Sequence, residues 1–207
     1  MPYKPGEREY RAMPLLAPPA TGEKRAEGDY YVEGYATTYN QPYLLGEIDG
    51  VKYYEQIDAR ALDGADMSDV IMQYDHGGRV LARQSNGTLW VEPNDPHGIK
   101  VAADLSKSDA ARAICEDIRA GLIEGMSWAF VVADDGDRFD RSTHTRTIRK
   151  IRKVYDVSAV SIPANPETDI TARSYCERRA AEARQEQAEK LAERERARAE
   201  CLALLSL

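Results

Sequence analysis

The chain has 207 residues, of which 43% are hydrophobic and 30% are charged, and its formal net charge is −7 at pH 7. This composition supports one domain with a core and tails, and the acidic balance disfavours nucleic acid as a partner. No apolar run approaches the roughly 18 residues of a membrane span. The first residues also lack the apolar core of a signal peptide. We therefore expect a cytoplasmic protein without a membrane partner.

Residues that commonly bind metals are few and scattered. The three cysteines are Cys115, Cys176 and Cys201, and the three histidines are His76, His97 and His144. The cysteines are odd in number and form no C-x-x-C pair, so the sequence indicates neither a disulfide framework nor a zinc site. Glycine-rich nucleotide-binding loops are also absent from the sequence. We expect no metal and no organic cofactor.

The N-terminal segment, residues 1–28, holds half of the ten prolines and is predicted to be mostly irregular. Within it, Tyr10 to Leu16 can form one edge strand. From residue 29 the chain becomes rich in Tyr, Val and Thr, which favour strands. Two glycine-containing pairs, Asp49-Gly50 and Asn86-Gly87, each lie between strand-like runs and predict hairpin turns.

A compact apolar run at 69–76 ends at His76 and is predicted to be a buried strand. A single helix is predicted over 109–122, with Ser106 or Ser108 as its cap and Gly121 at its end. Its apolar face is formed by Ala110, Ile114 and Ile118. The stretches 125–135 and 145–163 return to strand.

Six or seven strands in about 140 residues predict a mainly β domain with embedded helices, folded as a compact barrel or sandwich. We place this domain at 29–172. Residues 173–207 consist mainly of Ala, Glu, Arg and Leu and predict a charged helical tail. A basic run from Arg146 to Lys153 is interpreted as a solvated strand face, or alternatively as a contact for an acidic partner.

Each of two predicted strands carries a reactive side chain near one end. These side chains are His76 and Ser127. A serine becomes nucleophilic when a base, usually histidine, lies within hydrogen-bond distance. A third polar group then orients the imidazole ring. The Gly125-Met126-Ser127 segment is not the G-x-S-x-G elbow of α/β-hydrolases, because Ala129 stands where that motif has its second glycine.

Motifs between residues 30 and 170 resemble, in order and spacing, the tailed-bacteriophage prohead serine proteases, a family related to the herpesvirus assemblins. The matching segments are Gly34-Tyr35-Ala36, Glu55-Gln56-Ile57 with Ala61, Tyr74-Asp75-His76, Thr88-Leu89-Trp90-Val91, Gly98-Ile99-Lys100-Val101, Ile118-Arg119-Ala120-Gly121, Gly125-Met126-Ser127-Trp128-Ala129-Phe130, and Val157-Ser158-Ala159-Val160-Ser161 with Pro163-Ala164-Asn165-Pro166. The resemblance implies a compact β-barrel of the prohead protease type, with Ser127 as nucleophile and His76 as general base.

The third member of the triad has two candidates. An acidic residue usually precedes the V-S pair of the closing strand in the phage family, and that position is Asp156 here. Assemblins use a second histidine, for which His144 is the candidate. We favour Asp156, because a carboxylate beside His76 stabilises the imidazolium. Backbone amides near Ser127, or the side chains of Arg79 and Arg83, are candidate donors to an oxyanion.

The resemblance implies a serine endopeptidase that cleaves the scaffold, the major capsid protein and itself inside the assembling prohead, in the cytoplasm of the host cell. It also implies a homodimer as a possible state, by analogy with assemblins. The alternative is a non-catalytic capsid assembly or scaffolding module with an inactive protease-like domain. Convergence of His76, Ser127 and a carboxylate distinguishes the two, because a scaffold has no need of that geometry.

Overall fold

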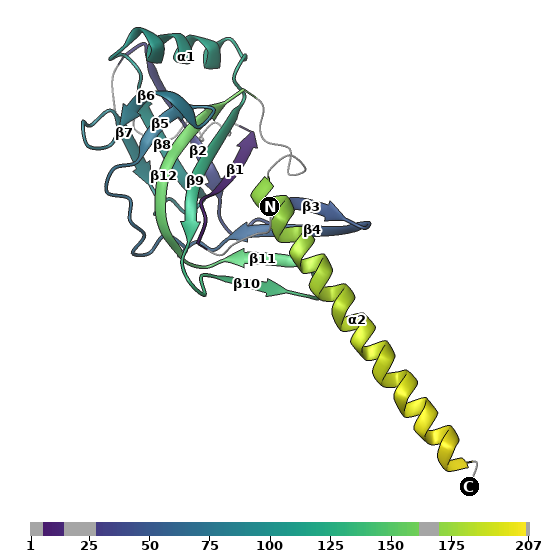
Figure 1. The fold of residues 1–207 in the computed structure, drawn as a ribbon. Helices are drawn as coiled ribbons and strands as arrows, with labels where there is room; N and C mark the ends of the chain where they lie inside the picture. Colours follow the sequence, from purple (N-terminus) through teal and green to yellow (C-terminus); the bar gives the residue numbers. More distant parts are fainter. Residues whose placement is uncertain (1–5, 15–27, 162–169, 206–207) are drawn as a thin grey trace.

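The computed structural model describes residues 6–14, 28–161 and 170–205 (Figure 1). The predictions for 1–5, 15–27 and 162–169, including the Pro163-Ala164-Asn165-Pro166 motif, lie outside the described residues. The elements in chain order are β1 (Glu9–Pro14), β2 (Tyr31–Thr38), β3 (Tyr43–Ile48), β4 (Val51–Ile57), β5 (Ile71–Tyr74), β6 (Gly77–Arg83), β7 (Leu89–Glu92), β8 (Gly98–Asp104), α1 (Asp109–Arg119), β9 (Gly125–Val132), β10 (Asp137–Asp140), β11 (Thr145–Ile148), β12 (Ile151–Val160) and α2 (Ile170–Leu205).

The core lies between a five-stranded sheet, ordered β1-β9-β12-β5-β6, and a three-stranded sheet, ordered β2-β8-β7. Trp128 and Phe130 of β9 and Val157 of β12 pack there with Ile99 and Val101 of β8. The central strand β9 is buried along its whole length, as its nearly continuous apolar sequence requires. Because β9 and β12 are neighbours at the centre of this sheet, side chains on them are held in a fixed register.

The predicted closed barrel is not what the described strands form. Their backbone hydrogen bonds divide them into three open sheets, the third being ordered β10-β11-β4-β3. The Asn86-Gly87 turn exists, with Gly87 at a φ of 72°. It does not close a hairpin, because β6 belongs to the five-stranded sheet and β7 to the three-stranded one. The mainly β prediction is confirmed, whereas the described strands do not close into the predicted barrel.

The predicted helix over 109–122 is confirmed as α1. The Ser108 side chain accepts a hydrogen bond from the Ala111 amide, and Gly121 follows the helix end with a φ of 70°. Ala111 and Cys115 are buried, so Cys115 is a small core residue. The residues predicted to form the apolar face are partly buried against the core: Ala110, Ile114 and Ile118.

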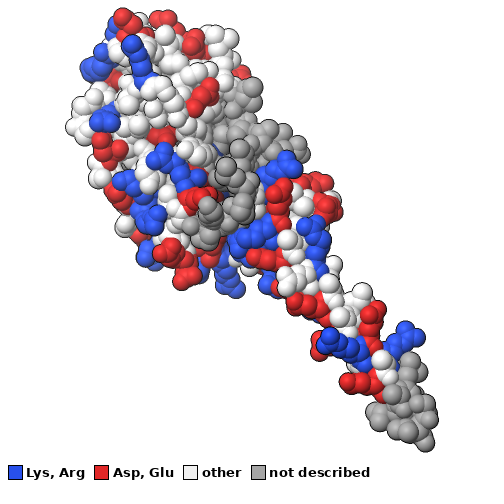
Figure 2. All heavy atoms as spheres, viewed as in Figure 1, with Lys and Arg blue, Asp and Glu red and all other residues white. Residues whose placement is uncertain are grey.

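The long helix α2 packs against the domain only with its N-terminal part (Figure 1). Its first turns lie against the four-stranded sheet, where Tyr175, Cys176 and Ala180 form a second core cluster with Leu45 and Tyr53. The turns beyond Lys190 project from the domain, and their described side chains are exposed. Figure 2 shows acidic and basic side chains interspersed along them. The helix prediction is confirmed, but its first turns are packed. None of the described helices combines the length and the apolar character needed to cross a membrane.

Candidate active site

His76 lies in the tight turn between β5 and β6. Tyr74 pairs with Gly77, so the turn residues are Asp75 and His76, both left-handed with φ values of 46° and 55°. The turn is tied to the end of β12, because the Asp75 carboxylate accepts hydrogen bonds from the Ser161 amide and hydroxyl at 3.3 and 3.4 Å. The predicted strand therefore ends at Tyr74, and His76 stands beyond it.

Ser127 lies on β9 between two hydrogen-bonded neighbours. It pairs with Ala12 of β1 on one side and with Ser158 of β12 on the other. Its chain neighbours Met126 and Trp128 point into the core. Because side chains alternate along a strand, Ser127 faces the opposite side of the sheet.

Three side chains from different elements meet on this face. The Ser127 Oγ lies 2.6 Å from His76 Nε2, and the Asp156 Oδ1 lies 2.6 Å from His76 Nδ1. Asp156 and Ser127 are 3% and 2% exposed. A hydroxyl aligned on one imidazole nitrogen, with a carboxylate on the other, is the arrangement that lets an imidazole remove the hydroxyl proton.

A fourth side chain supports the carboxylate. The buried Ser158 hydroxyl donates a hydrogen bond of 2.8 Å to Asp156 Oδ1, the same oxygen that contacts His76. Ser158 belongs to the V-S pair of the closing strand, and the sequence analysis assigned no role to it. The signal available was its spacing of two from Asp156, which places both side chains on one face of β12.

The other candidates lie elsewhere. His144 is in the β10–β11 turn, where its ring packs 5.6 Å from that of Tyr53. Arg79 is an exposed residue of β6, and Arg83 forms an ion pair of 3.5 Å with Asp69. The structure therefore brings together His76, Ser127 and Asp156, and places His144 in a turn of the four-stranded sheet.

Comparison with known proteins identifies the family of the chain. The sequence profile of the caudovirus prohead serine proteases matches residues 20–184, about four fifths of the chain. The chain belongs to that family. Among solved structures, the capsid assembly protease of bacteriophage T4, gp21, matches with a TM-score of 0.45 and 11% identity, over 76% of this chain and 99% of that one. No curated protein matches the chain.

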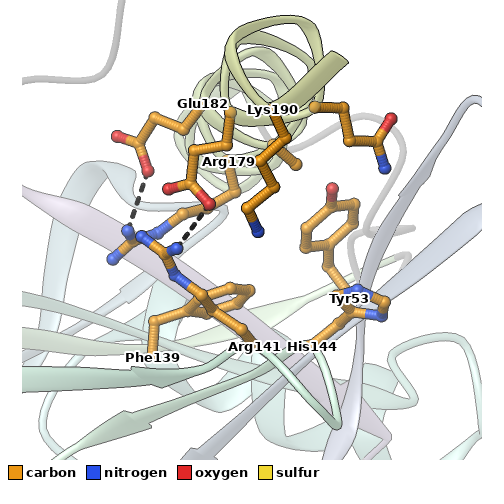
Figure 3. Close-up of a pocket in the computed structure, with 10 residues that line it drawn as sticks. Tyr53, Phe139, Arg141, His144, Arg179, Glu182 and Lys190 are labelled. Carbon is orange, nitrogen blue, oxygen red and sulfur yellow. Dashed lines mark hydrogen bonds and ion pairs between the residues drawn. The ribbon is translucent and has the colours of Figure 1, made fainter. Parts of the chain in front are cut away.

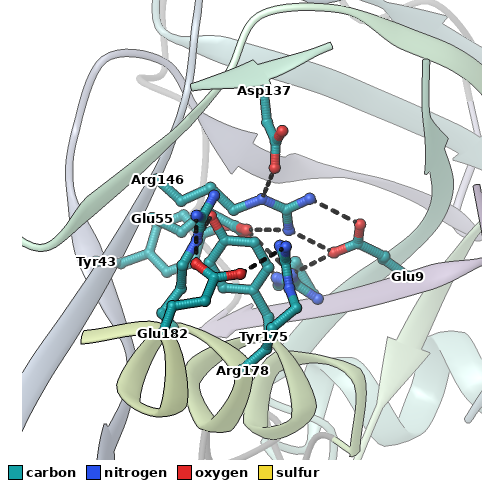
Figure 4. A network of polar contacts seen from close by, with 10 residues as sticks. Glu9, Tyr43, Glu55, Asp137, Arg146, Tyr175, Arg178 and Glu182 are labelled. Carbon is teal, nitrogen blue, oxygen red and sulfur yellow. Dashed lines mark hydrogen bonds and ion pairs between the residues drawn. The ribbon is translucent and has the colours of Figure 1, made fainter. Parts of the chain in front are cut away.

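This prohead protease contains a buried ion cluster behind β1 (Figure 4). Arg146 is fully buried and contacts Glu9 at 2.7 Å, Glu55 at 2.9 Å and Asp137 at 2.6 Å. Arg11 contacts Glu9 at 2.6 Å and Glu55 at 2.5 Å. The interpretation of Arg146 as part of a solvated face is wrong, because its pairing opposite Glu55 in the β11–β4 ladder turns it inward.

The cluster perturbs the pKa of a carboxyl group within it. Burial alone would raise the pKa of Glu9, but the charges of Arg146 and Arg11 outweigh burial and lower it to about 2. Burial also raises the pKa of Tyr43, and the negative charge of Glu55, which accepts its hydroxyl hydrogen bond, raises it further. Glu9 is thus held as a carboxylate by its two arginine partners.

A separate cleft of about 190 Å³ lies where α2 crosses the β10–β11 hairpin (Figure 3). Its walls carry the ion pairs Arg141–Glu186 and Arg179–Glu182, at 2.6 and 2.9 Å. His144 lines this cleft beside Tyr53. The Arg141–Glu186 pair bridges the hairpin and α2, so the cleft belongs to the α2 packing and not to the site at Ser127.

Proposed function

We propose that this prohead protease is an active endopeptidase in which Ser127 is the nucleophile, His76 the general base and Asp156 the group that orients the imidazole. The observation that carries the proposal is the continuous chain of two 2.6 Å contacts from Asp156 through His76 to Ser127. A non-catalytic assembly module gains nothing from this alignment, which includes a histidine at an unfavourable positive φ.

In this mechanism His76 Nε2 takes the Ser127 proton as Oγ bonds to the carbonyl carbon of the substrate. The tetrahedral intermediate collapses when the C–N bond breaks and the imidazolium gives its proton to the leaving amine. Water then attacks the acyl-enzyme, with His76 again removing a proton, and restores the Ser127 hydroxyl. Asp156 stabilises the imidazolium, and Ser158 holds the carboxylate oxygen that faces it.

The substrates proposed are capsid assembly proteins, namely the scaffold and the major capsid protein, inside the prohead in the host cytoplasm. The family membership supports this class of substrate. We also propose self-cleavage of the tail. Residues of α2 as far as Lys190 lie against the domain, since Glu186 pairs with Arg141 and Lys190 lines the cleft beside His144. The better site is therefore the part of α2 beyond Lys190, where the described side chains are exposed, and not the 165–180 interval suggested by composition.

The nucleophile is tested with a fluorophosphonate probe, which reacts with an activated serine hydroxyl. We expect mass mapping to place the adduct on Ser127 in the intact chain. Ser127→Ala and His76→Ala are expected to abolish labelling, and His144→Ala, the matched histidine control, to preserve it. Labelling that persists in Ser127→Ala, or that depends on His144, would contradict the assignment.

A further inference from the structure

The turn that carries His76 is energetically unfavourable by itself. Asp75 and His76 both have positive φ values, a conformation that costs a non-glycine residue roughly 1–2 kcal/mol. The Ser161 hydrogen bonds restrain Asp75 but do not touch the imidazole. The side chain of His76 is 18% exposed, so water reaches it from one side. Asp156 and Ser127 hold its two nitrogens, and a packing contact against the ring from another element limits the tilt of the imidazole and its exposure to water.

Tyr10 of β1 provides that contact. Its ring meets the His76 ring nearly edge to face, with centroids 4.7 Å apart and an interplanar angle of 70°. This is a favourable geometry for two aromatic rings. Tyr10 pairs with Ala129, two residues along β9 from Ser127, so it lies on the same face of the sheet as the nucleophile.

The opposite face of β1 is anchored in the buried ion cluster. Glu9 and Arg11, on either side of Tyr10, point into the buried ion cluster and are 2% and 5% exposed. Their partners Glu55 and Arg146 belong to β4 and β11 of the four-stranded sheet. The Arg146 guanidinium in turn lies 4.3 Å from the centre of the Tyr175 ring of α2 (Figure 4). The position of Tyr10 is therefore fixed by residues of three other elements.

We infer that Tyr10 is a positioning residue, whose ring holds the His76 imidazole in line with Ser127 and Asp156. The N-terminal strand β1 thus completes the active site. This inference rests on the proposed function of His76 as general base. The ring makes the contact, so phenylalanine can replace tyrosine, whereas alanine leaves the imidazole open to water and held only by its hydrogen bonds to Asp156 and Ser127.

The test compares fluorophosphonate labelling of Ser127 in the full-length wild type, Tyr10→Phe and Tyr10→Ala. The matched control is Tyr54→Ala, a half-buried tyrosine on β4. Varying the probe concentration separates the limiting rate from probe binding. Because small displacements of a catalytic group are costly, we expect Tyr10→Ala to lower the limiting rate about tenfold with unchanged probe binding. Tyr10→Phe and Tyr54→Ala are expected to stay within about twofold.

A second readout does not need a working nucleophile. Diethyl pyrocarbonate acylates accessible imidazole nitrogens, and mass mapping gives the rate at His76. In a Ser127→Ala background, we expect Tyr10→Ala, but not Tyr10→Phe, to raise that rate several-fold. If Tyr10→Ala does not fold, Tyr10→Leu, which fills space without an aromatic edge, is expected to give the same direction in both assays.

The two readouts separate the possible failures. Wild-type limiting rates and wild-type His76 acylation in folded Tyr10→Ala would overturn the inference. Equal losses in Tyr10→Phe and Tyr10→Ala would overturn it as well, because the ring would then not be the supporting group. An absence of Ser127 labelling in the wild type would instead refute the proposed function, and His76 acylation would still report whether Tyr10 shields the imidazole.

Discussion

Replacing Glu9 by glutamine tests how the buried ion cluster stabilises the fold. The Glu9 carboxylate contacts Arg11 at 2.6 Å and Arg146 at 2.7 Å, and Glu9→Gln removes its charge while keeping its shape. Arg146 and Arg11 lower its pKa from 4.5 to about 2 against the opposing effect of burial. In the unfolded chain the carboxyl group has its ordinary pKa. The unfolded state therefore takes up the proton first as the pH falls.

The stabilisation is fully present above a pH of about 4.5 and is lost as the pH falls toward about 2. The gap between these two values corresponds to about 3 kcal/mol. By pH 3 about 2 kcal/mol of this is lost. We therefore expect the wild type to exceed Glu9→Gln in stability by about 3 kcal/mol at pH 7, and by about 1 kcal/mol at pH 3.

The assay is urea denaturation of both proteins at several pH values between 7 and 3. The exposed Glu47→Gln on β3 is the matched control, and it is expected to follow the wild type throughout. Carboxyl groups that do not contact Arg11 or Arg146 contribute equally to both proteins, so the difference between the proteins isolates the ion cluster around Glu9. A difference that stays constant from pH 7 to pH 3 would refute the electrostatic account of the cluster.

Four further substitutions test the site and the fold. Asp156→Asn is expected to slow Ser127 labelling by roughly 10³-fold or more, while His144→Gln leaves it unchanged; the reverse pattern would select the assemblin-like alternative. Ser158→Ala removes the donor to the Asp156 carboxylate and is expected to lower the labelling rate about tenfold, with full activity arguing against support of the carboxylate. In Gly98→Ala the new Cβ would lie 1.9 Å from the Thr37 carbonyl oxygen, so thermal denaturation is expected to show a loss of about 2 kcal/mol or more, and an unchanged midpoint would contradict the close approach of β2 and β8.

Local sequence patterns predicted much of this fold. The Ser108 cap, the Asp49-Gly50 turn and the apolar run of β9 each reflect short-range preferences of the backbone, and the structure has all three. The Asn86-Gly87 turn was predicted, but its exit into a second sheet was not. Turn residues fix the reversal of the chain, whereas the choice of sheet depends on packing between distant strands.

The residues of the candidate site were predicted partly from the family resemblance and partly from the chemistry of their side chains. Residue type and motif order pointed to His76, Ser127 and Asp156, which the structure brings within hydrogen-bond distance. The roles of Arg146 and Tyr10 could not be predicted. Arg146 is buried only because parallel pairing of β11 with β4 sets it opposite Glu55. Likewise, Tyr10 reaches His76 only because β1 pairs with β9, and no local pattern encodes these long-range registers.

The most direct test of the central claim is co-expression of the full chain with its capsid protein and scaffold, followed by intact mass measurement of every chain. Wild type is compared with Ser127→Ala. The proposed function predicts discrete cleavage products in the wild type, including shortening of the protease beyond Lys190, and uncleaved masses in Ser127→Ala. Identical uncleaved masses in both samples, with normal capsid assembly, would contradict the protease and support the scaffolding alternative.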